Sequence, residues 1–211
     1  MIVVIEGIDG CGKDTQIELL RKEMKFEYFK YPTKDNQEIK DYLEKKGRWS
    51  SGANKQGNEN MFLDKEGMEI MRLFLDDIYA EQKKLAEASK KGLVIVDRYV
   101  FSTIAYQAEK IGSGIARIHN ARTMGKANFG NDAEFAKRAP KLVTETIARS
   151  MSLGINSIER DIDNRQFIKP NKVILLDIPS SISFERKKRQ KQLDRHEADK
   201  EFLERVRQNF L

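Results

Sequence analysis

The chain has 211 residues, of which 39% are hydrophobic and 34% are charged, a composition that indicates one soluble globular domain and excludes a disordered chain. Its net charge is +6, from 39 basic and 33 acidic residues, and so small an excess, with both signs mixed, favours a phosphorylated small ligand over a nucleic-acid partner. No apolar run is long enough to span a membrane, the N-terminus lacks a signal-peptide pattern, and the single cysteine, Cys11, excludes an internal disulfide, so we expect a cytoplasmic protein.

The predicted elements alternate between strands and helices. Runs rich in Val and Ile predict buried strands of a parallel sheet, and apolar residues three or four positions apart predict helices. In chain order these are a strand over 2–6, a helix over 13–24, a weaker strand over 26–31, a helix over 66–91, a strand over 93–97, a helix over 133–153, a strand over 173–178 and a helix over 199–211. This order predicts a single α/β domain over 1–211 with a mainly parallel sheet flanked by helices.

Three details refine this pattern. The helix over 66–91 carries an apolar stripe and closes on K-K-G, a C-terminal capping pattern. Segments 45–60 and 111–132 are rich in Gly, Ser and Asn, which predicts loops. Pro140 interrupts the helix over 133–153 unless that helix begins at the proline.

A glycine-rich loop follows the first predicted strand. Its sequence, E-G-I-D-G-C-G-K-D-T-Q over 6–16, fits the phosphate-binding pattern G-x-x-x-x-G-K-[ST] up to Lys13. The glycines let backbone N–H groups approach phosphate oxygens, and the helix that follows points its N-terminus at the anion. The alternative is a glycine-rich strand–helix turn with an incidental lysine. In either case we expect Cys11 to be a small filler residue rather than a nucleophile, because no His lies near it in sequence. We expect ATP to bind through Gly7, Ile8, Asp9, Gly10, Cys11, Gly12, Lys13, Asp14 and Thr15.

Asp14 departs from the pattern, which has a hydroxyl residue at this position. That hydroxyl normally ligates Mg²⁺ beside the terminal phosphates, and a carboxylate also binds Mg²⁺ but adds negative charge. Thr15 does not replace it, because neighbouring helical residues point about 100° apart. Two interpretations stay open: Asp14 binds the metal, directly or through water, or it turns outward and the metal is held elsewhere.

A second candidate segment, L-V-I-V-D-R-Y-V-F-S-T-I-A-Y-Q, spans 93–107. Asp97 ends a predicted strand at the carboxyl edge of the sheet, where open α/β sheets bind their ligands. A carboxylate there suits Mg²⁺, and Arg98 suits a phosphate. A strand-terminal turn with a surface ion pair explains the same two residues.

Together these motifs resemble the thymidylate kinases, P-loop enzymes that phosphorylate dTMP with ATP. The family's E-G-x-D-G-x-G-K-x-T-Q loop is matched over 6–16, and its D-R-Y-x-x-S-x-x-A-Y-Q motif over 97–107. Segment 170–207 resembles the family's strand, helix, arginine-rich lid and L-D-R run, and 29–32 resembles the turn after its second strand. The resemblance implies a P-loop NTPase-like fold, Mg²⁺ as cofactor, ATP and dTMP as substrates, a homodimer, and neither a nucleic-acid nor a membrane partner.

The resemblance also implies roles for individual residues. Asp9 contacts a hydroxyl of the acceptor sugar, Arg98 holds its phosphate, and Phe74 stacks on the thymine ring. The acceptor pocket further includes Ser102, Tyr106 and Gln107, of which the tyrosine limits room at the ribose 2′ position. The resemblance implies Asp97 as the metal-linked acid and places Arg195 at the ATP site, and Asp14 is a second candidate metal ligand in the first of the two interpretations given above. The implied catalytic residues are Lys13, Asp97, Arg98, Arg186 and Arg189.

A basic run, R-K-K-R-Q-K, begins at Arg186. By itself it indicates a solvated basic face, but the resemblance implies a mobile lid over about 186–196 that closes on the phosphates. Because Gly10 is not basic, the phosphate loop supplies no arginine, and a lid arginine is the expected source of charge in the transition state.

Besides Asp14, two features depart from the family pattern. The family usually places an arginine four residues after the stacking aromatic, where it contacts the thymine carbonyl, and here that position is Ile78. The connection over 108–172, with an atypical insertion at about 108–165, is longer than the family pattern predicts, and the sequence ends at residue 211, where we would expect the family's last strand and helix to follow. The base that this chain accepts is therefore not fixed by the resemblance. For the C-terminal end, we expect either weaker binding of the adenine of ATP or a sequence that is a fragment of a longer protein.

Two other functions fit parts of the sequence. A deoxynucleoside kinase, which phosphorylates a sugar hydroxyl, needs a carboxylate base, and Glu6 is the obvious candidate. A nucleotide-binding module that has lost catalysis accounts for Asp14 and Ile78. A kinase for another deoxynucleoside monophosphate is a third alternative to dTMP phosphorylation.

Overall fold

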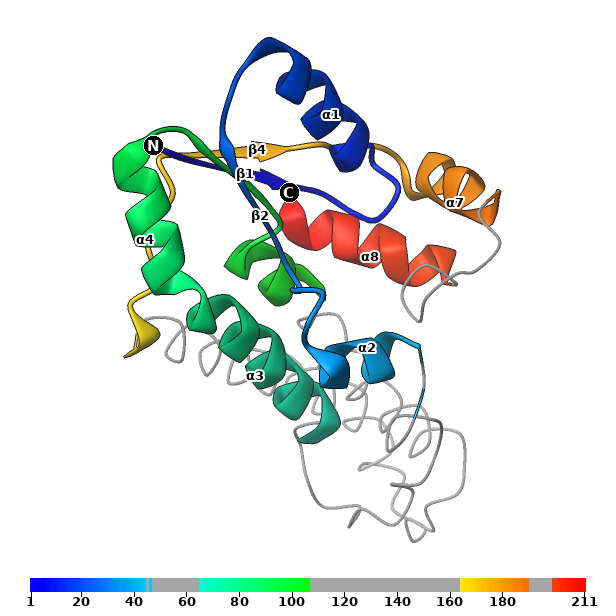
Figure 1. The fold of residues 1–211 in the computed structure, drawn as a ribbon. Helices are drawn as coiled ribbons and strands as arrows, with labels where there is room; N and C mark the ends of the chain where they lie inside the picture. Colours follow the sequence, from blue (N-terminus) through cyan, green and yellow to red (C-terminus); the bar gives the residue numbers. More distant parts are fainter. Residues whose placement is uncertain (45, 47–64, 107–163, 190–198) are drawn as a thin grey trace, which may run out of the picture.

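The computed structural model describes residues 1–44, 46, 65–106, 164–189 and 199–211 (Figure 1). The predicted loop over 111–132, the predicted helix over 133–153 and nearly all of the loop over 45–60 lie outside the described residues. None of the described helices is long and apolar enough to cross a membrane.

The described strands form one four-stranded parallel sheet, which confirms the predicted fold class. They are β1 (Ile2–Glu6), β2 (Glu27–Lys30), β3 (Val94–Asp97) and β4 (Lys172–Leu175), in the order β2-β3-β1-β4. The register aligns Ile5 with Asp97, and Lys30 with the same aspartate from the other side. Because parallel strands point the same way, the carboxyl ends of β1, β2 and β3 meet at one edge of the sheet.

Helices cover both faces of this sheet, as Figure 1 shows. The alternation of side chains along a strand sends Val3 and Ile5 to one face, where they pack with Ile17 of α1 (Lys13–Glu23). Ile2 and Val4 face the other side and pack against the apolar stripe of α3 (Lys65–Ala80) and α4 (Gln82–Lys91). β1 is therefore buried on both faces, which is why its sequence is a continuous apolar run.

The long helix predicted over 66–91 is two helices, and this prediction was wrong. The chain leaves helical geometry at Glu81, whose φ and ψ are −99° and 2°. The Gln82 side chain donates to the Ile78 carbonyl at 3.1 Å and accepts hydrogen bonds at 2.9 Å from the Tyr99 hydroxyl and the Ile168 backbone. The break thus ties the helix pair to two distant segments, and no glycine or proline marks it in the sequence.

The last predicted strand is shorter and more exposed than expected. β4 ends at Leu175 rather than 178, and it lies at the edge of the described sheet. Its side chains Val173 and Ile174 are 45% and 44% exposed. An apolar run predicts burial on both faces, but these two consecutive side chains point to opposite faces of the sheet, and both are left largely uncovered at this edge strand.

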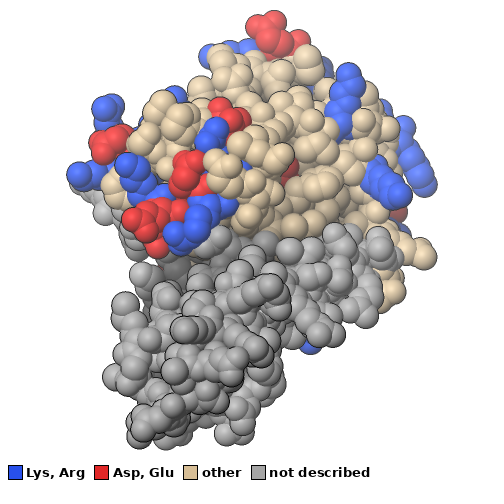
Figure 2. Space-filling model, turned by 180° about the vertical axis from the view of Figure 1, so that it is seen from behind, with Lys and Arg blue, Asp and Glu red and all other residues tan. Residues whose placement is uncertain are grey.

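The remaining helices surround the carboxyl edge of the sheet. They are α2 (Gln37–Leu43), a helical segment over 100–106, α7 (Ser180–Lys188) and α8 (Lys200–Phe210). The last of these confirms the predicted C-terminal helix and packs Phe202, Leu203 and Val206 against Ile8, Ala105 and Tyr106. On the face shown in Figure 2, blue and red side chains of the described residues lie side by side.

Candidate active site

The glycine-rich loop turns sharply between β1 and α1. Gly7 has φ of 139°, a conformation that side chains rarely adopt, and a Cβ there would lie 2.6 Å from the Leu176 carbonyl oxygen. Gly12 has φ of 105° and is the N-cap of α1. The backbone N–H groups at the start of α1 therefore face the loop, as a phosphate-binding site requires.

The Lys13 ammonium lies beneath this loop. It donates to the carbonyl oxygens of Gly7 at 3.0 Å and Ile8 at 3.2 Å, and the residue is buried. Burial, and next the positive charge of Arg98, lower the pKa of Lys13. Lys13, the predicted phosphate ligand, thus lies at the glycine-rich loop and donates hydrogen bonds to the loop's own carbonyl oxygens.

Asp14 forms an ion pair with a residue that the sequence did not single out. The Lys30 ammonium lies 2.7 Å from Asp14 Oδ1 and 2.9 Å from Asp97 Oδ2. Burial alone would lower the pKa of Lys30, but the hydrogen bond to Asp14 and the charge of Asp97 outweigh burial and raise it. The same bond lowers the pKa of the Asp14 carboxyl, and the Lys30 ammonium lies between the Asp14 and Asp97 carboxylates.

Asp97 is fully buried at the end of β3. Its Oδ2 accepts from Lys30 and, at 3.2 Å, from the Tyr28 hydroxyl, whereas its Oδ1 has no hydrogen-bond partner among the described residues. A buried carboxylate oxygen is normally satisfied by a donor or a cation. Among the described residues, no group of three or more His, Cys, Asp or Glu side chains is arranged to hold a metal ion by itself. Asp97, with Asp14 beside it, therefore fits an Mg²⁺ ion that takes its other ligands from phosphates and water.

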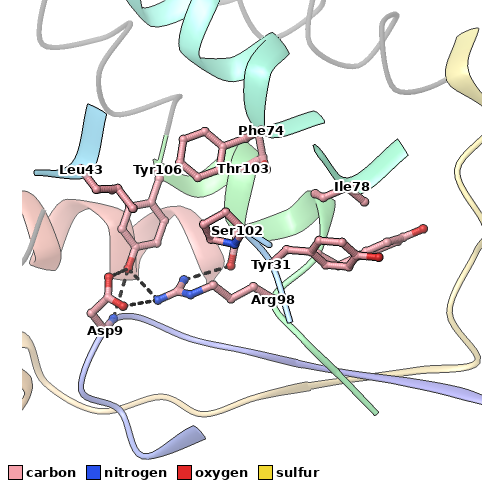
Figure 3. Close-up of a pocket in the computed structure, with 11 residues that line it drawn as sticks. Asp9, Tyr31, Leu43, Phe74, Ile78, Arg98, Ser102, Thr103 and Tyr106 are labelled. Atoms are coloured by element: carbon pink, nitrogen blue, oxygen red, sulfur yellow. Dashed lines mark hydrogen bonds and ion pairs between the residues drawn. The ribbon is translucent and has the colours of Figure 1, made fainter. Parts of the chain in front are cut away.

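Arg98 is held by a network that Figure 3 shows. The guanidinium is paired with Asp9, donates to Ser102 Oγ at 3.2 Å, and lies 5.2 Å from the centre of the Tyr106 ring. The Tyr106 hydroxyl donates to Asp9 at 2.7 Å, and burial raises its pKa well above the usual range. Arg98 itself has φ of 68°, which is uncommon for a residue other than glycine. Three positions implied by the family resemblance thus surround the fourth, Arg98.

The deoxynucleoside kinase alternative needs Glu6 as a general base, but in the structure the Glu6 carboxylate accepts hydrogen bonds from the chain itself. Its Oε1 accepts from the backbone N–H groups of Tyr99 at 2.8 Å and Ser102 at 3.3 Å, and its Oε2 accepts from the Ser102 hydroxyl. Burial raises the pKa of Glu6. With both oxygens engaged at the first turn of the 100–106 segment, Glu6 fixes the turn that presents Arg98.

A pocket opens beside Arg98 on the side of α3. Phe74 lines it together with Leu43 and Ile78, and the Phe74 ring meets Tyr42 edge-on with centroids 6.3 Å apart. Ile78 is 2% exposed and belongs to the core. Position 78, where the family pattern has an arginine, therefore contributes an apolar side chain to the pocket wall.

A second cavity lies over the glycine-rich loop. It is lined by residues 9–16, by the end of β2, and by further residues from the turn after β3 and from α7. Its cations are Lys13, Lys30, Arg98, Arg186 and Lys187. The Arg186 guanidinium donates to the carbonyl of Gly10 at 3.2 Å, and the Ser183 hydroxyl donates to that of Asp9. This cavity and the pocket beside Phe74 share Asp9, Tyr31, Pro32 and Arg98.

The structure gathers most of the predicted site residues at these two cavities. The loop residues from Asp9 to Thr15 line the second cavity, and Phe74, Ser102 and Tyr106 line the first. Arg189 ends α7 as its C-cap. Gln107 and Arg195 lie outside the described residues. Sequence reasoning did not single out Lys30 or Ser183, and it included Lys187 only as part of the basic run. Lys30 had one signal, its place near the carboxyl end of a predicted strand.

Comparisons with known proteins agree on one family. The thymidylate kinase family model matches residues 5–126, more than half of the 211 residues. A probable thymidylate kinase from Methanococcus maripaludis strain C7 is 36% identical over 107 residues, which are 50% of this chain and 45% of that protein. The chain thus matches about half the length of such curated relatives.

Two solved structures share the fold. A thymidylate kinase from Candida albicans superposes with a TM-score of 0.60 at 22% identity, covering 99% of this chain and 75% of the other. A deoxyadenosine kinase from M. mycoides has a TM-score of 0.54 at 16% identity, covering 100% and 81%. Identities this low establish the architecture alone.

Proposed function

The chain belongs to the thymidylate kinase family, and we propose that it transfers the terminal phosphate of ATP to dTMP. One observation carries the proposal: the cavity over the glycine-rich loop and the pocket beside Phe74 meet at Arg98. A donor phosphate chain over the loop and an acceptor nucleotide in the pocket would present their phosphates to each other at this junction. Such an arrangement supplies proximity and orientation, which dominate phosphoryl transfer.

The residues at the junction divide the work. Arg98 binds the acceptor phosphate in line with the donor, and Asp9 and Tyr106 hold its guanidinium in place. Lys13 neutralises charge on the transferred group from the loop side. Because the acceptor is already an ionised phosphate, the reaction needs no protein base, and the engaged oxygens of Glu6 agree with that.

Mg²⁺ as cofactor is part of the same proposal. Asp97 and Asp14 would hold it, and when bound it would neutralise phosphate charge and orient the donor. Arg186, Arg189 and Arg195 would act as lid residues around 186–196. A homodimer and a cytoplasmic location also belong to the proposal, and they are supported by the family resemblance.

Acceptor choice is tested with a panel of nucleotides. The purified protein is given ATP, Mg²⁺ and dTMP, dUMP, dCMP, dAMP or thymidine, and ADP release is measured. We expect turnover with dTMP and none with thymidine. Turnover of thymidine alone would contradict the proposal, and ATP binding without ADP release for any acceptor would identify a catalytically impaired module.

Three variants make this panel sharper. Lys13→Ala is expected to abolish ADP release, whereas Lys84→Met, which breaks an exposed ion pair with Glu81, retains it. Glu6→Gln separates the two kinase classes, because a general base contributes about 100- to 10,000-fold. We expect dTMP turnover to fall by less than about 100-fold, from the weakened contacts with Tyr99 and Ser102 alone. A loss of three orders of magnitude, in a folded variant, would favour the base role.

A further inference from the structure

We propose that the Lys30 ammonium is a built-in counterion that holds the space between Asp14 and Asp97 and so weakens Mg²⁺ binding at this end of the cleft. The proposal deepens the proposed function, because its consequence for catalysis rests on metal-assisted phosphoryl transfer. It assigns a role to Lys30, and it explains why a carboxylate is tolerated where the phosphate-loop pattern has a hydroxyl.

The sheet register brings Lys30 to this place. Lys30 is the last residue of β2, and it pairs in the sheet with Asp97, the last residue of β3. Asp14 is the second residue of α1, whose N-terminus lies over the same edge of the sheet. Three elements therefore converge on one ammonium, which lies 2.7 Å and 2.9 Å from the two carboxylates.

The position of the ammonium conflicts with that of a metal ion. Mg²⁺ sits about 2.0–2.1 Å from its oxygen ligands, so an ion bound to both Asp14 Oδ1 and Asp97 Oδ2 would occupy the space that the Lys30 ammonium now fills. Charge leads to the same conclusion: two carboxylates balance one divalent ion, and the ammonium adds a third positive charge beside it.

The unpartnered oxygen of Asp97 shows that this site has capacity for a further cation or donor. Oδ1 is buried and has no hydrogen-bond partner among the described residues. Lys30 thus pairs with one carboxylate oxygen of Asp97, Oδ2, and leaves the other, Oδ1, able to bind a cation or a hydrogen-bond donor. Asp14 is the more exposed member, with 79% of its side chain accessible, and Lys30 is 41% accessible, so the ammonium can leave without disturbing the core.

Metal binding to the nucleotide-free protein tests the proposal. Mn²⁺ replaces Mg²⁺ as the probe, and its free concentration is followed by electron paramagnetic resonance during a titration at pH 7.5. We expect Lys30→Met to bind Mn²⁺ at least about tenfold more tightly than the wild type, which is about 1.4 kcal/mol of binding free energy. Lys30→Arg keeps the charge and is expected to stay within about threefold of the wild type.

Two further variants locate the effect. Lys84→Met also removes one lysine from an ion pair with an acid, so it changes the net charge equally and is expected to leave Mn²⁺ affinity unchanged. Asp14→Ser combined with Lys30→Met removes one of the two carboxylates and is expected to cancel the gain. Thermal unfolding verifies that each variant is folded, and Lys30→Gln serves as a second charge-free variant.

An Mn²⁺ affinity of folded Lys30→Met and Lys30→Gln that equals or falls below that of the wild type would overturn the proposal. So would an equal gain in Lys84→Met, because the effect would then be one of net charge. The titration contains only protein and Mn²⁺, so its outcome does not depend on whether the acceptor panel finds kinase activity.

Discussion

The substitution Asp9→Asn tests how Arg98 is positioned. The asparagine keeps the shape of the side chain but removes the charge, and its amide nitrogen faces a donor in place of one carboxylate oxygen. Asp9 pairs with Arg98 and accepts from Tyr106 at 2.7 Å. The two partners of the ion pair are only 12% and 21% exposed, so solvent screens their interaction weakly.

The expected loss follows from these two contacts. A hydrogen bond to a charged group is worth about 1.5–3 kcal/mol and a neutral one about 0.5–1.5 kcal/mol, so each contact loses about 1–1.5 kcal/mol and the pair about 2–3 kcal/mol. For a chain of this size, that lowers the melting temperature by about 4–12 °C. If these roughly 2–3 kcal/mol are lost from the stabilisation of the transition state, because Arg98 is less well positioned, kcat falls about 30- to 160-fold.

The kinetics separate positioning from binding. Arg98 keeps its charge in Asp9→Asn and loses a neighbouring negative charge, so KM for dTMP is expected not to rise while kcat falls. ADP release at varied dTMP gives both constants, and calorimetry gives the melting temperature. Asp76→Asn is the matched control, because Asp76 pairs with Arg165 but is 61% exposed, and such pairs contribute little. A kcat within threefold of the wild type and an unchanged melting temperature would refute the reasoning.

Three further predictions concern stability. Gly7→Ala places a Cβ 2.6 Å from a backbone carbonyl at φ of 139°, which is expected to lower the free energy of unfolding by about 2–6 kcal/mol. Gly92→Ala is the control, because its Cβ meets no atom within 4 Å and the melting temperature should stay unchanged. Equal melting temperatures for the two variants would contradict the assigned clash. Asp77→Ala removes a buried acceptor of three hydrogen bonds from segment 33–36, and urea unfolding should show a loss of about 2–4 kcal/mol; a loss below 0.5 kcal/mol, on the order of a surface change, would show that the turn after β2 does not depend on this carboxylate. Hydrogen bonds from Gln208, Ser180 and Arg207 lower the pKa of Glu204 to about 2. Glu204 therefore stabilises the folded state at pH values above its ordinary pKa, and this contribution is lost as the pH falls toward 2. When the melting temperature is measured against pH, Glu204→Gln should flatten the profile in this range, and an unaltered profile would rule the contribution out.

Much of the fold follows from local sequence pattern. Apolar runs such as 2–6 mark strands buried on both faces, and the glycines of the loop mark a turn that side chains would block. The D-R-Y motif after a strand placed Arg98 at the ligand edge of the sheet. These features are legible because each depends on a short stretch of chain and on the chemistry of its own residues.

Other features depend on partners that are distant in sequence. The helix break at Glu81 comes from Gln82 contacts with Tyr99 and Ile168, and no local signal predicts it. β4 is exposed at the edge of the described sheet. A run of apolar residues does not indicate where in the sheet a strand will lie.

The sequence by itself determined the family and singled out the glycine-rich loop and the candidate acceptor residues, because these are carried by residue types at fixed spacings. It left the orientation of Asp14 open, since a carboxylate at that position is compatible with both a metal and an outward turn. Only the tertiary structure, by pairing β2 with β3, brought Lys30 within 2.9 Å of both Asp14 and Asp97. The charge balance of the site is thus a property of the assembled sheet, because its three members come from segments separated by up to 83 positions, from residue 14 to residue 97.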